Sequence, residues 1–163
     1  MNYTEIIKEF VYDCCSLSLT NYILSKESQE YFACSYLLNE KKVISRTAKK
    51  TPKKNGQFVV LWKRIDGGPI KPYHSFDAID FVVVNVKEEN YFGQFVFPKT
   101  ELIKQGVFST DLVEGKRAIR VYAPWVKVKS KQAIKTQLWQ LEYFLHLPID
   151  EPIDLKRARI LYS

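Results

Sequence analysis

The chain has 163 residues, of which 46% are hydrophobic and 26% charged, and its formal net charge is +7. These values are typical of one globular domain, and no apolar run is long enough for a membrane-spanning helix. The three cysteines, Cys14, Cys15 and Cys34, lack metal-ligand spacing, and the N-terminus lacks a signal-peptide pattern. The sequence therefore excludes a disulfide scaffold and a zinc module, and predicts a cytoplasmic protein.

The N-terminal half is predicted to hold a helix followed by strands. Apolar side chains recur at helical spacing in residues 2–13, and polar residues indicate a second short helix or turn within 18–29. Beyond residue 30 the pattern is that of strands and tight turns. The expected strands are 31–38, 43–50 and 57–65. The last of them is apolar on both faces in its middle, which indicates a central strand.

The C-terminal half continues with strands and two helices. Residues 79–86 form a nearly continuous apolar run and are the strongest candidate for a buried strand. Strands are also expected at 91–97 and 116–123, and a short helix at 99–105. A second helix is expected from Ser130 to Leu147, with an apolar stripe of Ile134, Leu138, Leu141 and Leu145. The remaining tail is expected to pack loosely.

Together these elements predict an α+β fold. Its central sheet would be mixed, largely antiparallel and five- to six-stranded, flanked by helices. No proline-, serine- or glycine-rich linker divides the chain, so residues 1–163 are expected to form a single domain. Within it we expect a helical N-terminal segment (1–29), a sheet-plus-helix core (30–147) and a tail (148–163).

The positive charge is concentrated in two blocks that contain no Asp or Glu. Residues 41–64 carry nine basic side chains, and residues 115–141 carry seven. One interpretation is that these blocks only improve solubility. The other is that they bind an anionic polymer, because basic side chains neutralise phosphates and flat rings stack on exposed bases. The sequence thus favours nucleic acid, DNA or RNA, as the partner.

The candidate nucleic-acid-binding residues are mostly basic side chains of these two blocks, together with two tryptophans. They are Lys49, Lys50, Lys53, Lys54, Lys63, Arg64, Lys99, Lys116, Arg117, Arg120, Trp125, Lys135 and Trp139. With no helix motif for reading bases, we expect low sequence specificity. Each tryptophan has the alternative of packing under a neighbouring loop.

Motifs for catalysis are weak. No phosphate-binding glycine loop and no nucleophile elbow is present. Asp77 and Asp80 are candidate Mg²⁺ ligands, since Mg²⁺ binds to one or two carboxylates plus phosphate oxygens, although both residues also suit capping of a loop or strand. A repeated Gly-Gln-Phe-Val at 56–59 and 93–96 has two interpretations: strand composition, which we favour, or two amides aimed at one ligand.

Several longer motifs together resemble the MepB family. They are GQFVVLWKR (56–64), GPI (68–70), DFVVVNV (80–86), GQFVFPK (93–99), GKRAIRVY (115–122), and the pairs QA, TQ and WQ within 132–140. The resemblance covers residues 25–147. The family is named from the third member of a multidrug-efflux operon that also encodes a pump and its repressor. This implies a bacterial cytoplasmic protein, but it implies no particular activity.

The strand order is also similar to that of the restriction-endonuclease-like core, which holds Mg²⁺ with acidic residues on neighbouring strands. Lys63 would then be the lysine of that core's Glu-x-Lys motif, but Leu61 stands where the acidic residue would be. A metal-dependent or degenerate nuclease, with Lys63 and Asp80 as catalytic candidates and Mg²⁺ as cofactor, is therefore the alternative function. A third is a protein-interaction accessory of the operon's regulator. No stretch indicates an apolar ligand pocket.

Overall fold

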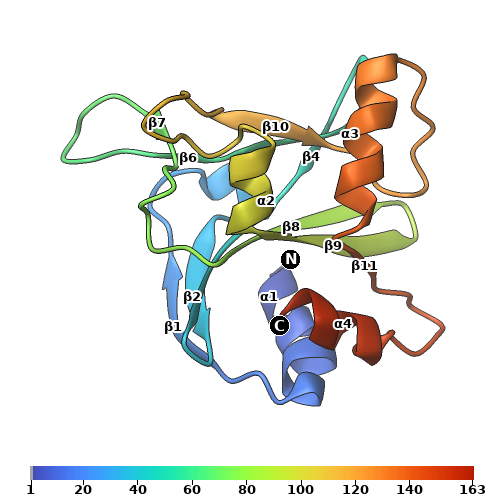
Figure 1. Cartoon of the computed structure of the whole chain (residues 1–163). Helices are drawn as coiled ribbons and strands as arrows, with labels where there is room; N and C mark the ends of the chain where they lie inside the picture. The colour runs from blue at the N-terminus through green and yellow to red at the C-terminus, as the bar shows by residue number, and fades with distance from the viewer. Residues whose placement is uncertain (1) are drawn as a thin grey trace.

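A six-stranded mixed sheet lies at the centre of the molecule (Figure 1). In this computed structural model, which describes residues 2–163, the strand order is β1-β2-β3-β8-β9-β11. Strands β3 and β8 run parallel, and all the other neighbours run antiparallel. The strands are β1 (Leu19–Leu24), β2 (Cys34–Leu38), β3 (Lys41–Thr47), β8 (Phe81–Glu88), β9 (Tyr91–Pro98) and β11 (Phe144–His146). The predicted α+β fold is confirmed.

Smaller elements cover the two faces of this sheet. Above it in Figure 1 lie two small sheets, in the orders β10-β5-β4 and β6-β7, together with two helices. We call these elements the upper layer. They are β4 (Lys49–Thr51), β5 (Lys54–Val60), β6 (Trp62–Lys63), β7 (Lys71–Pro72), β10 (Ala118–Val121), α2 (Lys99–Lys104) and α3 (Lys131–Leu141).

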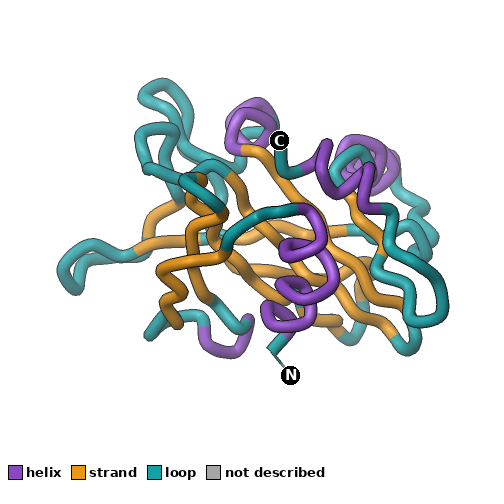
Figure 2. Tube along the Cα trace, turned by 90° about the horizontal axis from the view of Figure 1, so that it is seen from below, coloured by secondary structure: helices purple, strands orange, loops and turns teal. Residues whose placement is uncertain are grey.

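The lower layer is formed by both ends of the chain. Helix α1 (Tyr3–Ile7) continues as a π turn, η1 (Lys8–Tyr12), and a 3₁₀ turn, η2 (Asp13–Cys15). Figure 2 shows this segment lying across the strands of the sheet. Helix α4 (Leu155–Leu161) lies beside it, and a separate 3₁₀ turn, η3 (Gln29–Tyr31), precedes β2. Within residues 2–163, no helix is both long and apolar enough to cross a membrane.

The two layers explain why residues 79–86 are nearly all apolar. Successive side chains of a strand point to opposite faces. Val82 and Val84 of β8 therefore pack against the upper layer, whereas Phe81 and Val83 pack against the lower layer. All four side chains are buried. A strand with a hydrophobic core on each face needs no polar side. Burial of both faces therefore accounts for the apolar run in the sequence.

Two features of the N-terminal half differ from the predictions. Residues 19–24 form the edge strand β1, so the short helix or turn expected within 18–29 is limited to a bend at 26–27 and the start of η3 at Gln29. The predicted central strand 57–65 lies in the upper layer, where it is divided between β5 and β6. Leu61 separates β5 from β6, and at Ala48 the chain leaves β3 and starts the three-stranded sheet. Val59 and Leu61 are buried in the core that covers the upper face of the main sheet, so an apolar strand need not be central.

Two predictions for the C-terminal half are also wrong. Helix α3 ends at Leu141 rather than Leu147, because residues 144–146 pair with β9 as the edge strand β11. Ile134 and Leu138, the start of the predicted apolar stripe, are 42% and 67% exposed. The tail after residue 147 is not loose, since it includes α4, which buries Ala158, Leu161 and Tyr162.

A chain of buried hydroxyl groups connects the lower layer to the sheet. The Tyr12 Oη atom lies 2.6 Å from Tyr36 Oη and 2.9 Å from Tyr162 Oη. Tyr162 donates in turn to Gln94 Oε1 at 2.7 Å. Burial raises the pKa of all three tyrosines above the usual value of about 10. These hydrogen bonds join the first and last elements of the chain to β2 and β9.

The repeated Gly-Gln-Phe-Val motif is strand composition, as we favoured. Gln57 donates from Nε2 to the Lys87 carbonyl, and Gln94 bonds to Tyr162. Both amides are buried, and they lie in different sheets. They do not converge on one ligand, since each satisfies a polar group of the core.

Candidate nucleic-acid interface

Residues from both basic blocks line one polar cavity of about 510 Å³ in the upper layer. We call it the basic cavity. Four of the predicted residues, Lys54, Lys116, Arg120 and Trp139, are among its walls. The other lining residues are Gln105, Val107, Ala118, Ile119, Tyr122, Ser130, Gln132, Ala133, Thr136 and Gln140. None of the lining residues is acidic, so the cavity suits a negatively charged ligand.

The pairing of β5 with β10 brings the two blocks together. Arg120 of β10 lies opposite Phe58 of β5, and its guanidinium donates to Thr51 Oγ1 at 2.9 Å and to the Asn55 carbonyl at 3.1 Å. The Asn55 amide donates to the Lys127 carbonyl, which holds the β4–β5 turn against the loop that precedes α3. Segments about 70 residues apart in the chain therefore form one surface.

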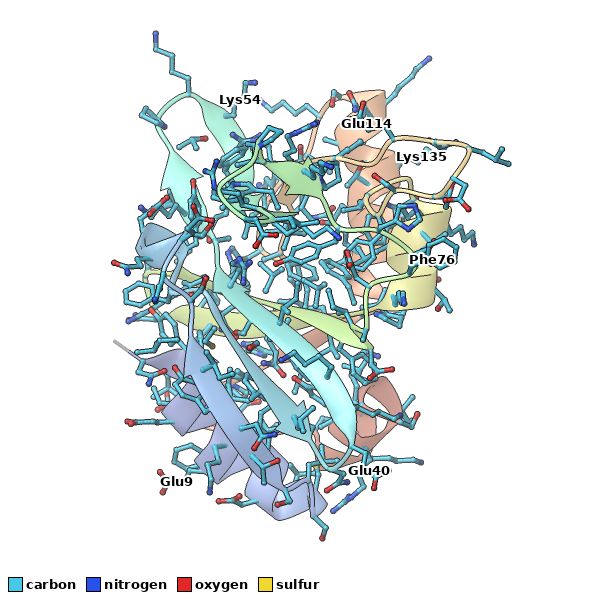
Figure 3. The ribbon with its side chains drawn as sticks, turned by 90° about the vertical axis from the view of Figure 1, so that its left-hand side faces the viewer. Glu9, Glu40, Lys54, Phe76, Glu114 and Lys135 are labelled. Carbon is cyan, nitrogen blue, oxygen red and sulfur yellow. The ribbon has the colours of Figure 1, made fainter. Side chains whose placement is uncertain are left out.

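Figure 3 shows where several charged side chains lie in the molecule. Lys54 and Lys135 project at one end, whereas Glu9 and Glu40 lie at the opposite end. Glu114 also lies at the basic end, where its carboxylate is 3.0 Å from Arg117 Nη2. Lys54, Lys116 and Lys135 form no ion pair with the described residues. Their charges are therefore available to a ligand.

Aromatic rings and cations alternate beside the cavity. Lys49 Nζ lies 5.0 Å from the centre of the Tyr31 ring, and the Arg120 guanidinium lies 5.9 Å from the centre of the Phe58 ring. The Tyr31 and Phe58 rings also meet edge to face, with their centres 6.4 Å apart. Rings of this kind flanked by cations are found where proteins bind single-stranded nucleic acids. Analysis of the sequence missed both rings, because Tyr31 lies outside the two basic blocks and Phe58 was interpreted only as part of a strand.

The glutamines of α3 have structural roles. Gln140 accepts from the Tyr122 main-chain N–H and donates to the Arg120 carbonyl, each at 2.9 Å. It thus completes the hydrogen bonds along the free edge of β10, which has no neighbouring strand on that side. Gln137 donates to the carbonyls of Ala123 and Val126. These contacts hold α3 against β10 and so form one wall of the basic cavity.

The two tryptophans lie in different places. Trp139 lines the basic cavity and packs against Phe97 of the core. Trp125 is not among the residues that line the cavity. Its ring stacks on Tyr91 with centres 5.2 Å apart, and its Nε1 donates to Glu88. The environment of Trp125 is the packing alternative that the sequence left open.

Eight of the eleven predicted basic residues do not line the basic cavity. Two of them are Lys49, which lies over the Tyr31 ring, and Lys135, which lies on α3. Lys63 and Lys99 both bind to Asp77, the first at its carboxylate and the second at its carbonyl. Arg64 is bonded to Glu27, and Arg117 to Glu114. Lys50 forms an ion pair with Glu88, which raises the pKa of Lys50, and Lys53 occupies the turn between β4 and β5.

The carboxylates proposed for Mg²⁺ already have protein donors. Asp77 accepts from Lys63 Nζ and from the His74 main-chain N–H, each at 2.7 Å, so both of its oxygens are used. Asp80 accepts from the Lys42 N–H at 2.8 Å and so caps the start of β3. Among residues 2–163, no group of three or more His, Cys, Asp or Glu side chains could hold a metal ion. Asp77 and Asp80 therefore serve as hydrogen-bond acceptors for the protein's own donors.

The strand that carries Lys63 is also in a different place from the one expected. The comparison with a restriction-endonuclease-like core requires this strand to lie beside β3 in the central sheet. Strand β3 has β2 and β8 as its neighbours, and Lys63 lies on β6 in a separate two-stranded sheet. There Lys63 Nζ lies 2.7 Å from Asp77 Oδ1, and the two side chains form an ion pair.

Replacing Gly115 by alanine tests the geometry of this region. A Cβ atom there would lie 2.2 Å from the Val107 carbonyl oxygen and 2.6 Å from the Ser109 nitrogen. We expect the G115A variant to lose about 2–4 kcal/mol of unfolding free energy, because the segment must move and break its hydrogen bonds. Urea denaturation measures this loss. In the G106A control, no atom lies within 4 Å of the added Cβ. Only the positive φ of residue 106 should then lower the free energy of unfolding, by about 1–2 kcal/mol. Equal losses in G115A and G106A would contradict the prediction.

An apolar cavity of about 630 Å³, which no stretch of the sequence indicated, lies in the lower layer. Its walls come mainly from α1, η1 and the segment 147–155. Tyr3, Phe10, Phe92 and Ile153 are among the lining residues. The apolar side chains are far apart in the chain, so no single stretch of sequence indicates the cavity.

Comparison with known proteins supports the resemblance seen in the sequence. A family model described as MepB-like matches residues 25–146. A solved structure described as the crystal structure of MepB is 32% identical, with a TM-score of 0.78. The alignment covers 93% of this chain and 99% of that one. No curated protein matches the chain. The match over most of the sequence, together with the shared fold, shows that this chain belongs to the MepB-like family.

Proposed function

We propose that this protein binds nucleic acid at the basic cavity and the adjoining face of the three-stranded sheet. The observation that carries the proposal is the convergence of two acid-free segments on one cavity without an acidic wall. Most exposed protein surfaces mix both signs of charge, whereas a polyanion requires a surface that is positive throughout. Lys49, Lys53 and Lys135 extend this positive surface beyond the cavity.

The aromatic rings favour a single strand over a duplex. Unpaired bases expose their faces, and Tyr31 and Phe58 are only partly buried beside Lys49 and Arg120. Stacking on such rings depends little on the identity of the base, so we expect low sequence specificity. A single strand should therefore bind more tightly than a duplex of equal length.

Fluorescence anisotropy of labelled oligonucleotides tests the proposal. We expect dissociation constants in the micromolar range or lower at about 50 mM salt. If six to ten phosphates are contacted, affinity should fall roughly 10³- to 10⁵-fold by 200 mM salt. Absence of binding to either single or double strands at low salt would overturn the proposal.

A matched pair of triple variants locates the binding surface. Replacing Lys54, Lys116 and Lys135 with glutamine should lower the salt slope by about 2–3, since each lost phosphate contact contributes about 0.7–0.9. Replacing three other exposed lysines, Lys41, Lys87 and Lys156, changes the net charge equally. Equal losses in the two triple variants would show nonspecific attraction and contradict a defined site.

Competition separates nucleic acid from an acidic protein partner. Unlabelled oligonucleotide should displace the labelled strand, whereas polyglutamate of the same charge should displace it poorly, because it has no rings to stack on Tyr31 and Phe58. Equal displacement by the two polymers would instead assign the surface to an acidic protein segment.

A further inference from the structure

Arg46 is a buried cation without a counter-ion. Arg46 lies on strand β3 and is 4% exposed. Nη1 donates to the Ser45 carbonyl at 3.0 Å, and Nη2 donates to Tyr73 Oη at 3.1 Å. Nε is buried and has no hydrogen-bond partner among the described residues. The guanidinium of Arg46 has five N–H donors but only two hydrogen-bond acceptors, both of them neutral.

No carboxylate within residues 2–163 lies within 4.0 Å of this guanidinium. A charge removed from water without an opposite charge is costly, so buried arginines are ordinarily paired. The nearby Asp77 lines the same cavity, but its carboxylate is already bonded to Lys63 and to the His74 N–H. The positive charge of Arg46 is therefore left for a group from outside the chain.

The guanidinium forms part of the wall of a cavity of about 370 Å³ between the sheet and the loop after β7. A second cation, Lys42, lies on the same face of β3, four residues away, and its Nζ donates to Ser35 Oγ at 3.2 Å. Apolar side chains of Ile23, Ile44 and Ile79 complete the walls. Two cations and hydroxyl groups within apolar walls are the arrangement found in sites for small charged ligands.

We propose that this cavity binds a small organic anion. Its carboxylate or phosphate group would be held by Arg46 and Lys42, because a guanidinium bonds to either oxyanion through two parallel hydrogen bonds. Its apolar part would lie against Ile23, Ile44 and Ile79. None of the residues that line this cavity lines the basic cavity, so the proposal is independent of nucleic-acid binding.

Isothermal titration with benzoate, phenyl phosphate and benzyl alcohol tests this site. The first two share a ring and differ in the anionic group, so the tighter of them identifies the preferred oxyanion. The neutral alcohol should not bind. Saturable binding of at least one anion at millimolar concentration or below supports the proposal, whereas no binding of either, or equal binding of the alcohol, overturns it.

The variant Lys42→Met tests whether the anion binds in this cavity. A charge-assisted hydrogen bond is lost, so the affinity should fall about tenfold or more. Lys41→Met is the matched control, because Lys41 is adjacent on the same strand, is exposed, and points to the opposite face. Oligonucleotide affinity should be unchanged in both variants. Unchanged anion affinity in Lys42→Met would show that the anion binds elsewhere and would overturn the assignment.

Arg46→Met distinguishes a ligand-binding arginine from a structural one. Without anion, its thermal midpoint should equal or exceed that of the wild type, since the variant no longer buries an unpaired charge. Added anion should raise the midpoint of the wild type but not of the variant. A lower midpoint together with a retained anion response would assign Arg46 to structure alone. If this variant does not fold, the comparison of Lys42→Met with Lys41→Met decides the question.

Discussion

Replacing Tyr162 by alanine is expected to lower the free energy of unfolding by about 3–5 kcal/mol, the usual loss for a buried aromatic side chain. The Tyr162 ring meets Tyr12 edge to face at 5.2 Å and packs on Phe81 at 5.7 Å. Its hydroxyl also bonds to Tyr12 and to Gln94. The variant therefore leaves a cavity and two buried polar groups with fewer partners. Urea denaturation followed by circular dichroism measures the loss.

Two further variants separate the contribution of the Tyr162 hydroxyl from that of its ring and provide a surface control. Tyr162→Phe retains the ring and should lose only about 1–3 kcal/mol, the cost of leaving the buried Gln94 oxygen without its donor. Ile160→Ala is the matched control on the same helix, because Ile160 is 64% exposed, and it should change stability by about 0.5 kcal/mol or less. If Tyr162→Ala were no more harmful than Ile160→Ala, the tail would be loosely packed, as the sequence alone suggested.

Above pH 10, Tyr12, Tyr36 and Tyr162 are together expected to destabilise the protein by up to about 4 kcal/mol per pH unit. Burial raises the pKa of Tyr12, Tyr36 and Tyr162 in the folded state. In the unfolded chain the same groups lose their protons near pH 10. The unfolded state then binds fewer protons, so stability falls as pH rises. The stabilisation is fully present below pH 10, and three groups at about 1.4 kcal/mol each give the slope.

Urea midpoints at pH 9, 10 and 11, with phenolate absorbance recorded in parallel, check this expectation. The three buried tyrosines should remain protonated until the protein unfolds, whereas exposed tyrosines should titrate earlier. Tyr143, whose pKa burial and Glu101 raise to about 12, adds to the slope with the same sign. Tyr12→Phe should reduce the slope by about 1.4 kcal/mol per pH unit, because it removes one group. A slope unaffected by that substitution would contradict the assignment to the buried tyrosines.

The charge pattern predicted part of the candidate site. Lys54, Lys116 and Arg120 were recognised because acid-free segments are visible without a structure, and these residues line the basic cavity. Lys63 and Arg64 belong to the same block, yet each is bonded to an acidic residue, Asp77 or Glu27. Glu27 lies 37 residues from Arg64 in the chain, so counting charges along the sequence could not identify this pairing.

Arg46 is the opposite case, a functional candidate that the sequence did not indicate. It occurs among the strand residues Val43, Ile44 and Ser45, where a basic side chain is normally expected to face water. Its burial depends on the loop that places Tyr73 over the upper face of the sheet. No local pattern separates a buried arginine from an exposed one, because the covering segment lies 27 residues away.

Local patterns by themselves determined the α+β class, the buried strand at 79–86 and the two basic segments. Each depends on neighbours in the chain: alternation, apolar runs and the absence of acidic residues. The tertiary structure decided that α3 ends at Leu141, since pairing of Phe144 with Phe95 in β9 competes with continued helical spacing. It also decided which cations are neutralised and which stay free. Both outcomes depend on contacts between distant segments, whose energies are comparable to those of the local preferences that they override.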